Sequence, residues 1–105
     1  MKPHWFYILL SLASAPRYGS AIQEDVRQLS GDKVRLWPAT LYGSLEELTE
    51  KGWLEELDSS EAPGSGAGRE RFYRISAEGR RALTSEAERM EGLAGVARAR
   101  LDGRA

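Results

Sequence analysis

The residues best suited to chemistry in this chain form a short run of hydroxyl and small side chains that begins at Pro38. Hydroxyls of Thr, Ser and Tyr bond phosphates or base edges, and small residues let a backbone approach DNA closely. The positive end of a helix dipole at the start of such a run also favours phosphate. The candidate DNA contacts here are Pro38, Ala39, Thr40, Tyr42, Gly43 and Ser44.

The charge balance restricts how this run could meet DNA. The net charge is −1 and the isoelectric point is about 5.9, whereas indiscriminate nucleic-acid binding favours a strongly basic domain. Between residues 16 and 75 there are eight Lys/Arg against eleven Asp/Glu, so a basic face must be assembled locally. Glu46, Glu47 and Glu50 follow the run and would be repelled by phosphates. Only the first turns of a helix here should therefore enter a groove.

The sequence offers little to an enzyme, a metal or a membrane. It has no cysteine and a single histidine, His4, which excludes thiolate nucleophiles, Cys-based zinc sites and a His-based catalytic pair. The glycines at 64, 66 and 68 lack the strand-to-helix context of a phosphate-binding loop. No apolar run reaches the roughly 18 residues of a membrane span. We expect a soluble, cytoplasmic protein that is not an enzyme and needs no cofactor.

Three helices should position the candidate run. Residues 5–13 are apolar nearly all round and predict a buried helix. After a turn at 17–19, residues 20–29 predict a second helix with a core stripe of Ile22, Val26 and Leu29. An extended stretch at 33–37 then leads to the run.

Pro38 suits the first position of a third helix, because its fixed φ is already helical and its missing N–H would be unpaired there anyway. The spacing of Leu41, Leu45 and Leu48 predicts one apolar stripe on this helix, and Gly52 predicts its end.

Two strands are expected next, at 53–57 and 71–75, joined by the polar, glycine-rich stretch 58–68. They predict a β-hairpin wing whose arginines, Arg69 and Arg71 among them, touch phosphates. The alternative is an ordinary surface hairpin with solvated charges.

A long helix should follow Ser76, which is a good N-cap. Its apolar residues recur at heptad-like steps and predict a dimer interface rather than a helix that folds back on its own domain. The interface residues are Leu83, Ala87, Met90, Ala94, Ala97 and Leu101. The first helix is expected to be core; a sharper alternative places a groove for flat ligands between it and the last helix, lined by Trp5, Ile8 and Met90.

The expected fold class is mainly α with a small β-hairpin (α+β): a winged helix-turn-helix over residues 1–75, then a dimerisation helix over 76–105, in one compact unit. The segments PRYGSAI, PATLYGSLEELTEKGWLEE and RFYRISAEGRRAL resemble the PadR family of bacterial transcriptional regulators, in the branch with a single short C-terminal helix. In that family a Pro-small-Thr-Leu-Tyr run opens the recognition helix. Here Trp37 stands where a small hydroxyl capping residue is common.

The resemblance implies a homodimer whose recognition helices enter successive major grooves of a pseudo-palindromic DNA operator. Lys33 and Arg35 would support entry of the helix, Thr40 and Tyr42 would contact backbone or base edges, and Arg69 and Arg71 would serve the wing. Repression by operator occupation, relieved by a small-molecule effector, is the function implied. The alternative from the acidic balance is a winged-helix module for protein contacts without specific DNA binding.

Overall fold

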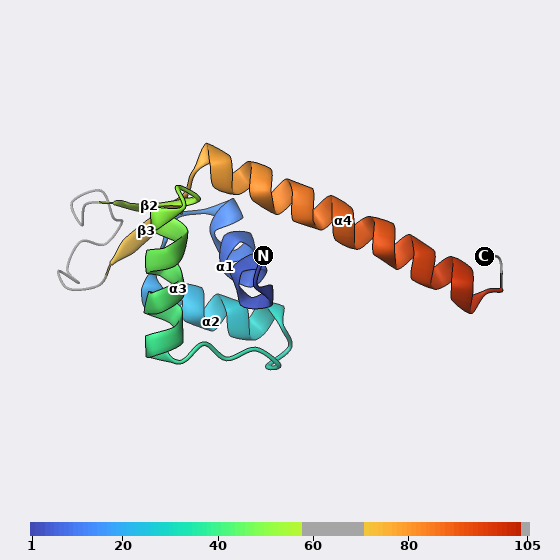
Figure 1. Ribbon diagram of the computed structural model, residues 1–105. Coiled ribbons are helices and arrows are strands. Elements are labelled where there is room, and N and C mark those ends of the chain that lie inside the picture. The colour runs from blue at the N-terminus through green and yellow to red at the C-terminus, as the bar shows by residue number, and fades with distance from the viewer. Residues whose placement is uncertain (58–70, 104–105) are drawn as a thin grey trace.

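The computed structural model describes residues 1–57 and 71–103, and this part of the chain is mainly α-helical (Figure 1). The helices expected near the N-terminus, from Pro38 and after Ser76 are confirmed. The predicted loop at 58–68 and Arg69 lie outside the described residues. The elements are α1 (Pro3–Ser14), β1 (Arg17–Tyr18), α2 (Gly19–Leu29), α3 (Pro38–Glu50), β2 (Leu54–Leu57), β3 (Phe72–Ile75) and α4 (Ala77–Leu101).

The first three helices surround the hydrophobic core. The predicted leucines of α3 are its clearest members, since Leu41, Leu45 and Leu48 are each at most 1% exposed. Burying a leucine side chain contributes about 1.5–3 kcal/mol relative to leaving it in water. The predicted burial of the α2 stripe is confirmed for Ile22 and Val26. It is wrong for Leu29, which is 46% exposed at the end of the helix.

A three-stranded antiparallel sheet with the order β1-β3-β2 closes one end of this core. The expected hairpin is present, with Leu54 opposite Ile75 and Leu57 opposite Phe72. Residues 17–18 were expected to form a turn and instead form β1, with Arg17 opposite Tyr73. The short strand fills the edge of β3 that the hairpin leaves open.

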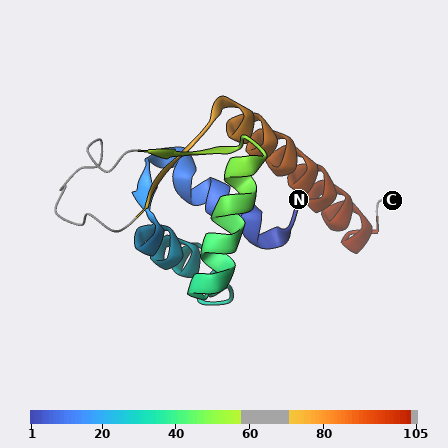
Figure 2. The same ribbon diagram turned by 60° about the vertical axis from the view of Figure 1, so that its left-hand side comes forward.

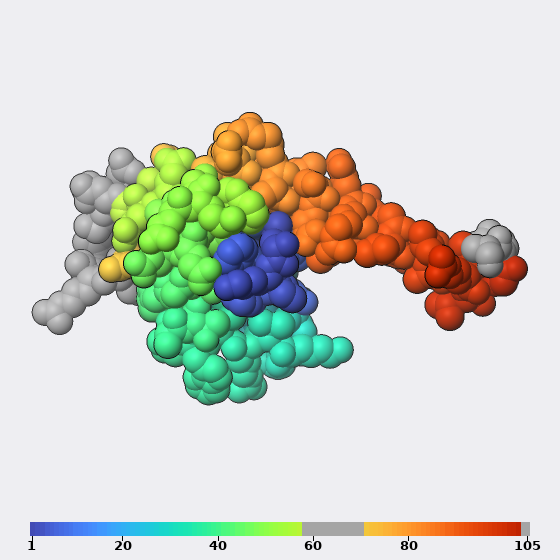
Figure 3. All heavy atoms as spheres, in the orientation of Figure 1, coloured from blue at the N-terminus to red at the C-terminus, as the bar shows by residue number. Residues whose placement is uncertain are grey.

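Helix α4 starts on the core and then leaves it. Ser76 caps it as predicted, accepting a hydrogen bond from the Gly79 N–H at 3.0 Å, and Leu83 packs against the core. Beyond that point the helix projects as an arm, which Figure 1 and the space-filling view in Figure 3 both show. The arm accounts for the elongated shape of 56 × 28 × 22 Å.

Candidate nucleic-acid interface

The outward face of α3 begins with small side chains and ends with acidic ones. Pro38, Ala39, Thr40 and Gly43 are exposed, as the sequence predicted for groove contacts. The acidic residues Glu46, Glu47 and Glu50 are also exposed but lie further along the helix. Helix α3 stands in the foreground of Figure 2, between the hairpin and the start of the chain. Only its first two turns offer DNA a face free of carboxylates.

Ser44 was expected on this outward face and is not there. Its side chain is 4% exposed, and its hydroxyl lies 3.0 Å from Nε2 of His4 on α1. Residue 44 lies three positions after Leu41 and next to Leu45, so the helical period carries it to the core side. The hydroxyl therefore ties α3 to α1 and cannot reach DNA.

Tyr42 is half-buried and packs over the start of α2. A Cβ on Gly19 would lie only 2.6 Å from the Tyr42 hydroxyl oxygen, so the Tyr42 ring could keep this position against α2 only with glycine there and would otherwise have to shift. The ring is thus positioned by packing. Tyr42, Gly43 and Arg71 line one hollow of about 410 Å³. The fourth lining residue is Glu46.

This hollow brings together three residues that the sequence assigned to DNA, two from α3 and one from the hairpin. Two arginines of the hairpin pair with carboxylates: Arg71 Nε lies 3.5 Å from a Glu56 carboxylate oxygen, and Arg74 Nη2 lies 2.9 Å from one of Glu55. A hydrogen bond and a charge interaction with Tyr73, followed by the charge of Glu56, raise the pKa of Arg71 above its usual range. An approaching phosphate has to compete with the Glu56 carboxylate for Arg71.

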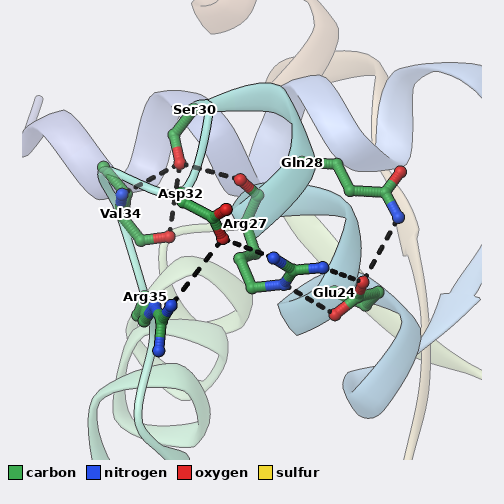
Figure 4. A network of polar contacts seen from close by, with 7 residues as sticks. All are labelled: Glu24, Arg27, Gln28, Ser30, Asp32, Val34 and Arg35. Atoms are coloured by element: carbon green, nitrogen blue, oxygen red, sulfur yellow. Dashed lines mark hydrogen bonds and ion pairs between the residues drawn. The ribbon is translucent and has the colours of Figure 1, made fainter.

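A second group of cations lies where α2 leads into α3 (Figure 4). Arg27 bonds Glu24 at 2.6 Å and also bonds Asp32. The bonds from Arg27, and then one from Gln28, lower the pKa of Glu24 to about 2. Arg35 Nη2 is 3.9 Å from the same Asp32 oxygen, so its pairing is loose and its side chain stays 63% exposed.

The backbone of this connection is fixed by side chains of α2. The Val34 N–H donates to the Ser30 hydroxyl at 2.9 Å, and Gln23 Nε2 donates to the Leu36 carbonyl. Lys33 and Arg35, which the resemblance assigned to the helix entry, are both exposed on it. Beside it lies a hollow of about 180 Å³ whose lining includes Arg27, Arg35 and Trp37.

The C-terminal arm carries the predicted interface residues in two groups. Leu83 and Ala87 are half-buried, while the predicted interface residues beyond them are exposed. Met90 is 39% and Leu101 is 86% exposed, and Ala94 and Ala97 lie exposed between them. Two further exposed apolar side chains, Leu93 at 56% and Val96 at 46%, were not predicted, because the heptad pattern was read through the alanines.

The first helix belongs to the core, as the main interpretation of the sequence predicted, and two residues of the alternative ligand groove are buried with it. Ile8 is fully buried and Trp5 is 7% exposed, so both belong to the core and offer little surface to a ligand. Trp5 meets Trp53 edge-to-face, with ring centroids 6.1 Å apart. Of the three groove residues, only Met90 is exposed.

Membrane and metal chemistry find no support in the described residues. Within residues 1–57 and 71–103, no helix is long and apolar enough to cross a bilayer. The same residues contain no group of three His, Asp or Glu side chains able to hold a metal ion.

Comparison with known proteins decides what kind of molecule this is. The model of the transcriptional regulator PadR-like family matches residues 8–85. The chain belongs to the PadR-like family. A PadR-like chain is a transcriptional regulator, which confirms the resemblance seen in the sequence. The family match runs from α1 into the first turns of α4.

The chain is also similar to individual proteins. An uncharacterized protein in a transposon of Streptomyces fradiae is 35% identical over 88 residues, which are 84% of this PadR-like chain and 23% of that protein. The chain therefore spans about a quarter of the length of this relative. RosR of H. salinarum has 27% identity and a TM-score of 0.68, over 86% of this chain and 74% of RosR.

Two further solved structures share the fold. A transcriptional regulator from Clostridium thermocellum has a TM-score of 0.71 at 23% identity, over 90% of this chain and 88% of that one. A PadR family regulator from Clostridium difficile has a TM-score of 0.71 at 19% identity, over 92% and 96% of the two chains. The expected winged-helix architecture, four helices with a small antiparallel sheet, is thereby confirmed.

Proposed function

We propose that this regulator is a homodimer that binds a pseudo-palindromic DNA operator and represses by blocking a promoter. The observation that carries the proposal is the charge pattern around the start of α3. Ala39, Thr40 and Gly43 form a small, open face there, and the exposed cations Lys33 and Arg35 lie in the connection that leads into α3. Phosphates are attracted to this end, while the carboxylates further along the helix keep the rest of α3 out of the groove.

The roles of the candidate residues follow from their positions. Thr40 contacts a base edge, since its hydroxyl lies on the open face of the first turn. The hollow lined by Tyr42, Gly43 and Arg71 takes the sugar-phosphate backbone at the rim of the groove, with Arg71 as the cation. Arg69 serves the wing in the same way. Lys33 and Arg35 bind phosphates on the other side of the helix entry.

The arm of α4 supports the homodimer. A helix that projects into water gains little from its own propensity, and most helical stability comes from packing of an apolar face. The apolar face here is exposed from Met90 to Leu101. A second copy of the chain would cover it symmetrically, with the same residues on both sides. Two recognition helices related by that symmetry would meet half-sites about one helical turn, or ~34 Å, apart.

A small-molecule effector would relieve repression by binding one arrangement of the two subunits better than the other. A flat ligand bound between α1 and α4 of the dimer would change the angle between the two winged helix-turn-helix domains. Each of these helices has an exposed apolar side chain that such a ligand could contact, Met90 on α4 at 39% and Leu10 on α1 at 37%.

One observation favours a different function, a winged-helix module that contacts proteins. Glu46 lies in the hollow beside Arg71, and Glu56 pairs with that arginine, so carboxylates balance the positive charge at this hollow. A surface with balanced charges would suit a protein partner better than a phosphate backbone.

Selection from a pool of random DNA duplexes tests the proposed function. The purified protein is incubated with the pool, and bound duplexes are amplified over several rounds. We expect enrichment of one sequence with two inverted half-sites. Recovery of random sequences after all rounds would contradict the proposal and direct the search to protein partners.

A further inference from the structure

The connection between α2 and α3 presents alternate side chains to water. Val34 is half-buried and Leu36 is 3% exposed, whereas Lys33, Arg35 and Trp37 are exposed. Successive side chains of an extended backbone point to opposite sides, so anchoring Val34 and Leu36 inward turns the other three outward. We call Lys33, Arg35 and Trp37 the loop stripe. The connection runs along the edge of the molecule opposite the start of α4 (Figure 1).

Trp37 is the unexplained member of this stripe. The other tryptophans, Trp5 and Trp53, pack edge-to-face at the core, but Trp37 is 69% exposed. It is the N-cap residue of α3, yet its side chain makes no capping hydrogen bond. The indole therefore serves neither the core nor the helix start, and the fold does not account for a tryptophan at this position.

The side chains around the Trp37 ring indicate the kind of surface that it could contact. Trp37 borders the hollow of about 180 Å³ that Arg27 and Arg35 also line. Within residues 1–57 and 71–103, Arg27 is neutralised by Glu24 and Asp32, whereas Arg35 has a single ion pair, a long contact of 3.9 Å to Asp32. An aromatic ring beside exposed cations matches a surface that alternates phosphates with apolar groups, as a DNA groove does.

Building on the proposed function, we propose that Trp37 is a DNA-contact residue. Its indole packs on an apolar group of the operator, either a thymine methyl or a deoxyribose, while Lys33 and Arg35 hold neighbouring phosphates. The Gln23 bond to the Leu36 carbonyl already ties the backbone of the connection to α2, so the backbone next to Trp37 is positioned before DNA arrives. The tryptophan that departs from the family pattern thereby adds contact area at the start of the reading helix.

The test compares Trp37→Ala, Trp37→Phe and wild type on the operator from the selection, by fluorescence anisotropy. A tryptophan contact of this kind is expected to be worth about tenfold in affinity, and phenylalanine should retain most of it. Leu29→Ala is the matched control, since Leu29 is another exposed apolar side chain, 46% exposed at the end of α2. It should bind like wild type.

An operator in which uracil replaces thymine identifies the apolar group. Loss of the Trp37→Ala effect on this operator assigns the contact to a thymine methyl, and an unchanged effect assigns it to deoxyribose. Equal operator affinity of Trp37→Ala and wild type overturns the inference but leaves the proposed function standing. A wild type that cannot distinguish the operator from a scrambled duplex overturns both.

A second readout does not depend on affinity. The emission of Trp37, taken as the difference between wild type and Trp37→Phe, should be protected from acrylamide when operator is added. Unchanged acrylamide quenching on a saturated complex would contradict the contact directly. Thermal melts of all variants should agree, because Trp37 is largely exposed in the free protein.

Discussion

The Nε2 atom of His4 lies 3.0 Å from the hydroxyl oxygen of Ser44, which joins the start of α1 to the middle of α3. The chain has no other histidine. Nearby, Lys2 pairs with Glu47 at 3.3 Å. Burial and then the charge of Lys2 lower the pKa of His4 below 6.5, while Glu47 acts in the opposite direction. The helix that reads DNA in our account is thus attached to a neutral imidazole.

This attachment predicts a loss of stability in mild acid. With the folded-state pKa of His4 below its unfolded value, the unfolded chain binds more protons as the pH falls through 6.5, so the free energy of unfolding decreases there. The Tm of wild type should fall between about pH 7.5 and about pH 5.5, on either side of the ordinary imidazole pKa. His4→Gln should show a smaller fall, measured by circular dichroism.

Ser44→Ala is the control for this experiment. Desolvation is the largest cause of the lowered His4 pKa, so this variant should keep most of the pH dependence although it loses the hydrogen bond. Equal pH dependence in wild type and His4→Gln would rule His4 out as its source.

Gly79 predicts a large packing effect where α4 starts. A Cβ at this position would lie 2.1 Å from the Trp53 carbonyl oxygen, so the backbone must move to accept it. Gly79→Ala should lower the free energy of unfolding by about 1–3 kcal/mol, measured by urea titration at fixed protein concentration. Gly92→Ala, in the same helix with nothing within 4 Å, should instead stabilise by about 0.5–1 kcal/mol. Similar shifts for both would contradict the close contact.

Much of this fold could be predicted because its signals are local. Pro38, the leucine spacing of α3 and the Ser76 cap each depend on a few neighbouring residues. Strand β1 could not be predicted in this way. Its two residues pair with β3, more than fifty positions later, and only that partner makes Arg17 and Tyr18 a strand.

The candidate site was predicted less completely than the fold. The open face of α3 follows from the helical period, but Ser44 was assigned to it on chemistry although the same period carries it inward. The exposure of Trp37 could have been inferred from the alternation of Val34 and Leu36 in the extended connection. The burial of Ile8 and Trp5 agrees with the buried helix predicted from the all-round apolar residues 5–13, whereas the alternative ligand groove required both side chains at a surface.

Glu46 predicts a variant that binds DNA more tightly. Its carboxylate shares the hollow with Tyr42, Gly43 and Arg71, where our account places the DNA backbone. Glu46→Gln should increase operator affinity by about two- to fivefold at low salt, because it removes a repulsion between exposed charges. Glu50→Gln, at the far end of α3, should change affinity little. Unchanged affinity for Glu46→Gln would place the backbone elsewhere.

The arm predicts a variant that cannot dimerise. Leu93 and Leu101 are 56% and 86% exposed, and glutamates at both positions would place charges inside the proposed interface. Leu93→Glu/Leu101→Glu should sediment as a monomer at concentrations where wild type is a dimer, and should keep its helical circular dichroism. Glu88→Lys, on a face of α4 without large apolar side chains, should remain dimeric. A dimeric double variant would exclude the arm as the interface.

The most direct test of the central claim is an anisotropy titration of the protein against its selected operator and a scrambled duplex, each at two salt concentrations. We predict that the operator binds on the order of 10³-fold more tightly or better. We also predict that Arg35→Ala weakens both duplexes and reduces the salt slope by about one, as expected for the loss of a phosphate contact. Equal affinity for operator and scrambled duplex at both salt concentrations would contradict sequence-specific recognition by this regulator.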